Sequence, residues 1–91
     1  MKIWKWTLEV TDMQSLLMPK GARLLDVQMQ GGVPRLWALV GEHTQNEQRH
    51  FAMYGTGHPV PEEPGDYVAS FQIDDGALVF HVFERGSRSP E

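Results

Sequence analysis

The sequence predicts an all-β domain, a small antiparallel barrel or sandwich of six to seven short strands. Apolar residues recur with a period of two along the chain, which is the spacing of a strand with one buried face. No window shows the 3.6-residue period of an amphipathic helix. Two dipeptides, Gly31-Gly32 and Asp75-Gly76, separate alternating segments and are typical of two-residue hairpin loops.

The first part of the chain contains one clear strand and one ambiguous element. The apolar residues of the first strand are Trp4, Trp6, Leu8 and Val10. Residues Ser15 to Met18 form either a second strand or a helical turn opened by Asp12, and we favour the strand. Pro19-Lys20-Gly21 then turns the chain.

The two hairpin loops fix the expected cross-strand registers. In the first hairpin the apolar pairs are Val27–Leu36, Leu25–Ala38 and Met29–Pro34, and the reverse face pairs Asp26–Trp37 and Gln28–Arg35. In the second they are Ile73–Leu78, Phe71–Phe80, Ala69–Val82 and Tyr67–Glu84, and the reverse face pairs Gln72–Val79, Ser70–His81 and Val68–Phe83. Because the turn rule and the hydrophobic pattern agree, we expect both hairpins to form part of the core.

The rest of the chain is a polar loop, Gly41 to Gln48, followed by a strand from Arg49 to Tyr54. We expect one β domain over residues 1–84 and a frayed tail over residues 85–91, which has no apolar anchor. The expected core is Trp6, Leu8, Leu25, Val27, Leu36, Ala38, Phe51, Phe71, Ile73, Leu78, Phe80 and Val82.

Composition narrows the function classes. The 91 residues contain no cysteine, which excludes a disulfide framework and a cysteine-based metal site. The longest apolar run, Leu36 to Val40, is far too short to span a bilayer, and the N-terminus lacks the apolar core of a signal peptide. A net charge of −4 argues against binding to duplex nucleic acid, and we expect a soluble cytoplasmic protein.

The Gly/Pro-rich segment Tyr54 to Asp66 is the candidate binding loop. Gly55-Thr56-Gly57-His58 resembles a short anion-binding nest of backbone N–H groups with a hydroxyl and an imidazole. The alternative is that these glycines only turn a sheet corner. An anionic ligand also needs cationic or aromatic side chains, and the candidates are Arg49, Arg35 and Trp37.

No catalytic or metal constellation emerges from the sequence. Ser70 and His81 face each other in the expected register, but a nucleophile also needs an orienting acid and an oxyanion hole, so a polar cross-strand pair is the better interpretation. The spacings of His43, His50, His58 and His81 match no standard zinc pattern. The doublets Glu62-Glu63 and Asp74-Asp75 are interpreted as solvated charge. We therefore expect neither catalysis nor a cofactor.

Surplus apolar surface favours a homo-oligomer. Trp37, Val68, Val79 and Phe83 fall on faces opposite the apolar stripes of their hairpins. A partner subunit could cover them, and so could a segment of the same chain, such as residues 11–20.

Five collinear segments carry a resemblance: Lys2–Gln14, Pro19–Gln30, Leu36–Val40, Tyr54–Val60 and Gly76–Glu84. They resemble a family of short proteins of unknown function encoded by bacteriophages and prophages. The resemblance implies a small accessory protein in the cytoplasm of an infected bacterium, and brings no catalytic residues with it.

Two function classes follow from this resemblance. The first is a non-enzymatic binding protein that counters host defence, by sequestering a small nucleotide-like signal or by blocking an effector protein. The second is a structural or assembly component of the virion. An enzyme is the least supported class.

Overall fold

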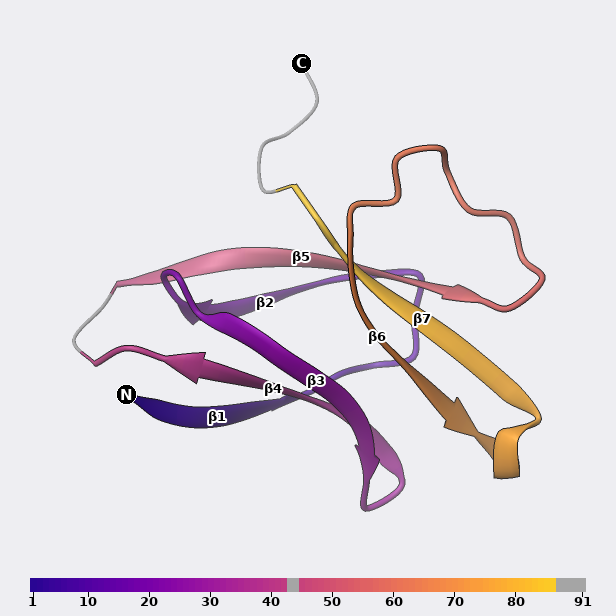
Figure 1. The fold of residues 1–91 in the computed structure, drawn as a ribbon, viewed down its shortest axis with the longest axis horizontal. Helices are drawn as coiled ribbons and strands as arrows, with labels where there is room; N and C mark the ends of the chain where they lie inside the picture. The colour runs from indigo at the N-terminus through magenta and orange to yellow at the C-terminus, as the bar shows by residue number, and fades with distance from the viewer. Residues whose placement is uncertain (43–44, 87–91) are drawn as a thin grey trace.

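The computed structural model describes residues 1–42 and 45–86. In this part of the chain, seven strands form two antiparallel sheets that pack as a sandwich, and there is no α-helix (Figure 1). The all-β prediction is confirmed, and of its two forms the sandwich is correct and the closed barrel is not. Within the same residues no helix has the length and hydropathy needed to cross a membrane.

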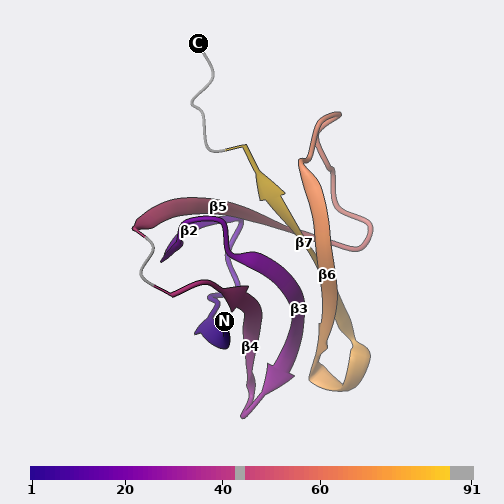
Figure 2. The same ribbon diagram turned by 60° about the vertical axis from the view of Figure 1, so that its left-hand side comes forward.

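The first sheet has the strand order β1-β4-β3, and the second has the order β2-β5-β7-β6. The strands are β1 (Lys2–Thr7), β2 (Met13–Pro19), β3 (Arg23–Gln30), β4 (Val33–Val40), β5 (Asn46–Gly55), β6 (Asp66–Ile73) and β7 (Leu78–Arg85). A short 3-10 turn, η1 (Asp74–Gly76), joins β6 to β7. The edge strands β3 and β6 of the two sheets pack against each other, which closes one side of the sandwich (Figure 2). The ambiguous element after Asp12 is a strand, β2.

The first hairpin turns at Gly31-Gly32 as predicted. Both glycines have positive φ, 64° and 84°, which two-residue type I′ loops require at both central positions. The predicted register holds from the Gln30–Val33 pair to the Asp26–Trp37 pair. A β-bulge at Leu25 then shifts the strand by one residue. The predicted Leu25–Ala38 pair is therefore wrong, and Leu24 lies opposite Ala38 instead.

The second hairpin turns at Asp75-Gly76, and the predicted pairs from Ile73–Leu78 to Ala69–Val82 are correct. A bulge at Val68 ends the agreement: Tyr67 lies opposite Phe83 rather than Glu84, and Val68 packs against the core. A bulge places two residues opposite one, so each residue beyond it changes face. No turn rule reveals a bulge, because the turn only fixes the register nearest to it.

The core lies between the sheets, and most of it was predicted. Seven of the twelve expected residues are buried: Leu8, Val27, Leu36, Ala38, Phe51, Phe71 and Val82. Trp6, Ile73 and Phe80 are partly buried against this cluster. Leu25 and Leu78 are wrong, with 44% and 46% of their surface exposed, because one sits at the bulge and the other at a strand end. The core residues not predicted are Met18, Ala22, Val40, Ala52, Met53 and Ala69.

The last strand extends one residue into the predicted tail. Arg85 is the last residue of β7, and its Nη1 donates a hydrogen bond to the Tyr54 hydroxyl at 3.1 Å. Most of the expected tail, residues 87–91, lies outside the described residues.

Replacing Gly32 by valine should lower the free energy of unfolding by about 1–3 kcal/mol. No described residue lies within 4 Å of the position that a Cβ would take there, so the effect comes from holding a β-branched residue at φ 84°. Chemical denaturation measures it. The same substitution at Gly86, where φ is ordinary and space is also open, is the control and should have little effect. Equal stability of the two variants would contradict the assigned loop.

Candidate functional site

The predicted binding loop forms a tight turn at the end of β5. The His58 N–H donates to the Gly55 carbonyl at 3.0 Å, and Gly57 has φ 88°, as the third residue of a type II turn requires. The Thr56 N–H donates to the Val79 carbonyl on β7 at 3.0 Å. Two of the amides that an anion nest would offer are therefore bonded to backbone carbonyls. This geometry favours the sheet-corner interpretation of the turn.

The turn borders two hollows of different size. The larger, about 590 Å³, is lined by Val10, Thr11, Asp12, Met13, Met53, Tyr54, Gly55, His58, Pro59 and Phe80. The smaller, about 300 Å³, is lined by Gly55, Thr56, His58 and residues 77–80. The His58 ring lies over Gly55, where an added Cβ would come within 3.3 Å of its Nδ1. Among the residues that the structure describes, neither lining contains a lysine or an arginine, so these hollows offer little to an anionic ligand.

A chain of hydroxyl and imidazole groups runs from the turn across the second sheet. Thr56 Oγ1 lies 2.7 Å from His81 Nε2, and Ser70 Oγ lies 2.7 Å from His81 Nδ1. Ser70 Oγ also lies 2.7 Å from the Tyr67 hydroxyl. The predicted cross-strand pair of Ser70 and His81 is thus present. Because a hydroxyl occupies each ring nitrogen, the position that an orienting carboxylate takes in a catalytic triad is filled by Thr56.

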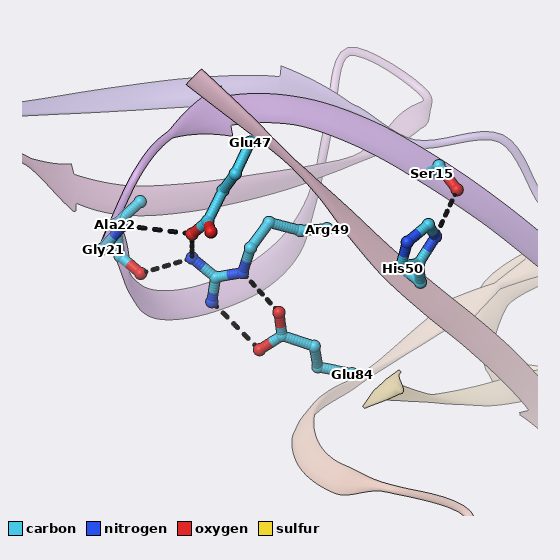
Figure 3. A network of polar contacts seen from close by, with 7 residues as sticks. All are labelled: Ser15, Gly21, Ala22, Glu47, Arg49, His50 and Glu84. Atoms are coloured by element: carbon cyan, nitrogen blue, oxygen red, sulfur yellow. Dashed lines mark hydrogen bonds and ion pairs between the residues drawn. The ribbon is translucent and has the colours of Figure 1, made fainter. Parts of the chain in front are cut away.

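Arg49 does not join the turn; its side chain links β5 to β7 and to the connection between β2 and β3 (Figure 3). Its guanidinium makes a two-pronged ion pair with Glu84 on β7, and its Nη1 donates to the Ala22 carbonyl at 2.8 Å. Glu47 lies 3.7 Å from the same Nη1. The side chain is only 15% exposed. The hydrogen bond to Glu84 raises the pKa of Arg49 above its ordinary value, desolvation opposes this, and the charges of Glu84 and Glu47 add to it.

Arg35 and Trp37 are neighbours on β4, on the outer face of the first sheet, and belong to the opposite sheet from the turn. Lys5 on β1 lies directly opposite Trp37, and Thr7 lies opposite Arg35. The structure therefore divides the predicted site into three: the Gly55–His58 turn, the internal Arg49, and Arg35 with Trp37. It adds Lys5, which sequence analysis missed because the pairing of β1 with β4 joins segments about 30 residues apart.

The two cations beside Trp37 have no anionic partner. Lys5 Nζ donates to Gln30 Oε1 at 2.7 Å, and Arg35 Nη1 donates to Thr7 Oγ1 at 2.6 Å. Both acceptors are neutral, and across residues 1–42 and 45–86 no carboxylate is within ion-pair distance of either cation. Arg35 Nε is buried and has no hydrogen-bond partner in the part of the chain that the structure describes. We call Lys5, Arg35 and Trp37 the tryptophan face; it has the donors that an anion needs.

The acidic residue opposite Trp37 is Asp26, which forms hydrogen bonds with the next two residues of its own strand. The carboxylate of Asp26 accepts hydrogen bonds from the Val27 N–H and from Gln28 Nε2, each at 2.8 Å. Its position opposite Trp37 therefore does not neutralise Lys5 or Arg35 through an ion pair. The two cations and Asp26 together leave this face with one net positive charge (+1 +1 −1), which favours an anionic ligand.

A third cleft, larger than either hollow beside the turn, is lined by acidic rather than basic residues. It measures about 850 Å³ and lies where the ends of the two hairpins meet the β1–β2 connection. Its lining is Thr7, Leu8, Glu9, Val10, Met29, Gly32, Val33, Pro34, Gln72, Ile73, Asp74, Asp75 and Gly76. Of the described residues, three with carboxylates and none with a cationic side chain line this cleft, so it disfavours an anionic ligand. Among the residues that the structure describes, no three potential ligand side chains gather as a metal site, and His43 lies outside those residues.

Comparison with other proteins gives a family and no function. Neither a curated protein nor a solved structure matches the chain significantly. The profile of one family, described as a domain of unknown function and designated DUF7352, matches residues 1–91. Since the match extends over the whole chain, this protein belongs to the DUF7352 family.

Proposed function

We propose that this protein binds a small anionic ligand without transforming it, and that the ligand binds on the tryptophan face. One observation carries the proposal: two cations without carboxylate partners among the described residues flank a half-buried tryptophan in a chain of net charge −4. Charged donors that meet only neutral acceptors gain more from an anion than paired ones do. The Gly55–His58 turn becomes the secondary candidate, because its amides are already bonded.

The chemistry of the face favours a nucleotide-like ligand. Indole is a platform on which any base can stack. The planar guanidinium of Arg35 suits bidentate binding of phosphate, and Lys5 supplies a second, point-like charge. Cross-strand neighbours lie about 5 Å apart, and same-face neighbours along a strand about 7 Å apart, so the three groups span one nucleotide. Two cations are too few to hold the backbone of a duplex.

The biological setting of the proposal comes from the resemblance to phage-encoded proteins. In an infected bacterium, this protein would act in the cytoplasm as a non-catalytic nucleotide binder and counter host defence by sequestering a small immune signal. The same exposed face could instead block an effector protein that carries an acidic surface. The two mechanisms share the cations and differ in the size of the bound molecule.

An assembly role in the virion is the second candidate, and exposed apolar residues on an edge strand favour it. On β1, Ile3 and Trp4 are 60% and 48% exposed, and one edge of this strand has no partner strand among the described residues. Unpaired edges with apolar side chains are sites where another chain can add. Detection of the protein in purified virions would support this role.

A thermal-shift screen tests the binding proposal. The probes are nucleotides, cyclic dinucleotides and ADP-ribose derivatives, each at about 100 μM. A ligand with a dissociation constant near 1 μM should add about 2.7 kcal/mol of stability, which raises the melting temperature measurably. A pull-down from bacterial lysate runs in parallel. A specific protein partner with no shift from any probe would replace ligand sequestration by effector blocking.

Removing either cation should weaken binding of the ligand found in this screen by about 10- to 100-fold, the usual loss of a charge-assisted hydrogen bond. The variants are Lys5→Gln and Arg35→Gln, measured by isothermal titration calorimetry. Lys20→Gln removes an exposed cation elsewhere and should bind like the wild type. Thr56→Ala alters the turn and should also bind normally. If Thr56→Ala abolishes binding while Arg35→Gln does not, the ligand site is the turn.

A further inference from the structure

The outer face of the β2-β5-β7-β6 sheet has an unusual composition. The strand registers place alternate residues of each strand on this face, and among the described residues there is no aspartate or glutamate. The whole chain has 12 acidic residues, and the outer face of the other sheet carries one of them, Asp26. In place of acidic residues the β2-β5-β7-β6 face carries Met13, Leu17, Tyr54, Tyr67, Phe83 and Arg85.

Three aromatic rings form a continuous row across this face. Phe83 lies between Tyr54 and Tyr67, with ring centroids 5.7 Å and 5.5 Å away and both contacts edge-on. Tyr67 is 59% exposed. Arg85 extends back along the sheet to the Tyr54 hydroxyl. Tyrosine, phenylalanine, methionine and arginine are enriched in protein interfaces, while aspartate, glutamate and lysine are depleted.

We propose that this carboxylate-free face is a self-association surface through which two copies of the chain pair about a twofold axis. A protein of net charge −4 repels its own copies wherever carboxylates would meet. Two copies of this face bring no carboxylates together. Each copy instead offers an arginine to the aromatic row of the other, an attraction of the cation–π kind. A twofold axis requires a face that complements itself, and this one contains both partners of that attraction.

The size of the face agrees with a dimer of modest stability. Four strands spaced about 4.8 Å apart, each about 27 Å long, give a flat footprint on the order of 500 Å² before side-chain relief is counted. Stable interfaces bury about 800 Å² of accessible surface on each partner. The sequence predicted an oligomer surface that contains Trp37, Val68, Val79 and Phe83, and the structure does not place these four residues on one face. Val79 and Phe83 belong to the carboxylate-free face, whereas Trp37 is on the other sheet and Val68 turns into the core.

Sedimentation velocity over about 5–200 μM tests the proposal with two matched variants. This range covers the weak, micromolar end of interface affinities. Tyr67→Glu places a carboxylate on the face, and Ile3→Glu places one on an edge strand of the other sheet at almost the same exposure, 59% against 60%. Because both side chains are largely exposed, both variants should fold, which circular dichroism checks.

The wild type and Ile3→Glu should sediment as dimers, and Tyr67→Glu as a monomer with at least a tenfold weaker association. A wild type that is monomeric over the whole range would overturn the proposal. So would a Tyr67→Glu dimer, or dissociation caused by Ile3→Glu alone. The proposal does not depend on the tryptophan face, so ligand binding can fail while dimerisation holds.

Discussion

Truncating Phe71 to alanine should lower the free energy of unfolding by about 3–5 kcal/mol, a large part of the stability of a small domain. Phe71 is only 4% exposed and stacks on Phe80 with ring centroids 5.6 Å apart. The substitution removes the ring's buried area and leaves a cavity between the sheets. Urea denaturation followed by tryptophan fluorescence measures the loss.

Phe80→Ala is the matched comparison. Phe80 is the other half of the same stacked pair but is only partly buried. Its truncation should therefore cost less than that of Phe71, because solvent already reaches part of the ring. A Phe71→Ala variant that melts like the wild type would mean that the register of the second hairpin is wrong.

Replacing Arg49 by methionine should cost about 3 kcal/mol. The substitution leaves Glu84 in a largely buried position without its cation, and breaking a buried pair costs about 3–5 kcal/mol. The lower end applies because Glu84 remains 21% exposed. Since the pKa of Arg49 is raised, the guanidinium stays charged and its stabilisation is lost only above the ordinary pKa of arginine. The stability lost in Arg49→Met should therefore not change with pH near neutrality on account of the titration of Arg49.

The double variant Arg49→Met with Glu84→Leu distinguishes an ion pair from mere packing. Apolar replacement of both partners often restores stability, because no charge is left unpaired. The double variant should be more stable than Arg49→Met alone, a positive coupling in a double-mutant cycle. Additive losses would show that Arg49 acts only by filling space.

The hairpins could be predicted from sequence because turn chemistry and strand alternation act locally. Gly31-Gly32 and Asp75-Gly76 determine their registers with no knowledge of the rest of the fold. The bulges at Leu25 and Val68 could not be predicted, because the turn residues of the two hairpins determine only the register next to the turn. Both bulges lie in edge strands, where bulges are common, and which strands lie at an edge is a tertiary property.

The candidate site was harder to predict because it depends on which strands are neighbours. Arg49 looked like a ligand residue since it precedes the Gly55 turn on the same strand, but the alternation of β5 turns it inward to Glu84. In the sequence, only their side-chain chemistry marks Trp37 and Arg35 as candidates. Lys5 became visible only when β1 was found beside β4.

Native mass spectrometry of the protein purified from bacteria tests the central claim most directly. The wild type should carry a bound small molecule with the mass of a nucleotide-like anion. The double variant Lys5→Gln with Arg35→Gln should lack that mass and remain folded. A nucleotide mass retained by the double variant, or a wild type that carries none and is stabilised by no nucleotide, would contradict ligand binding on the tryptophan face.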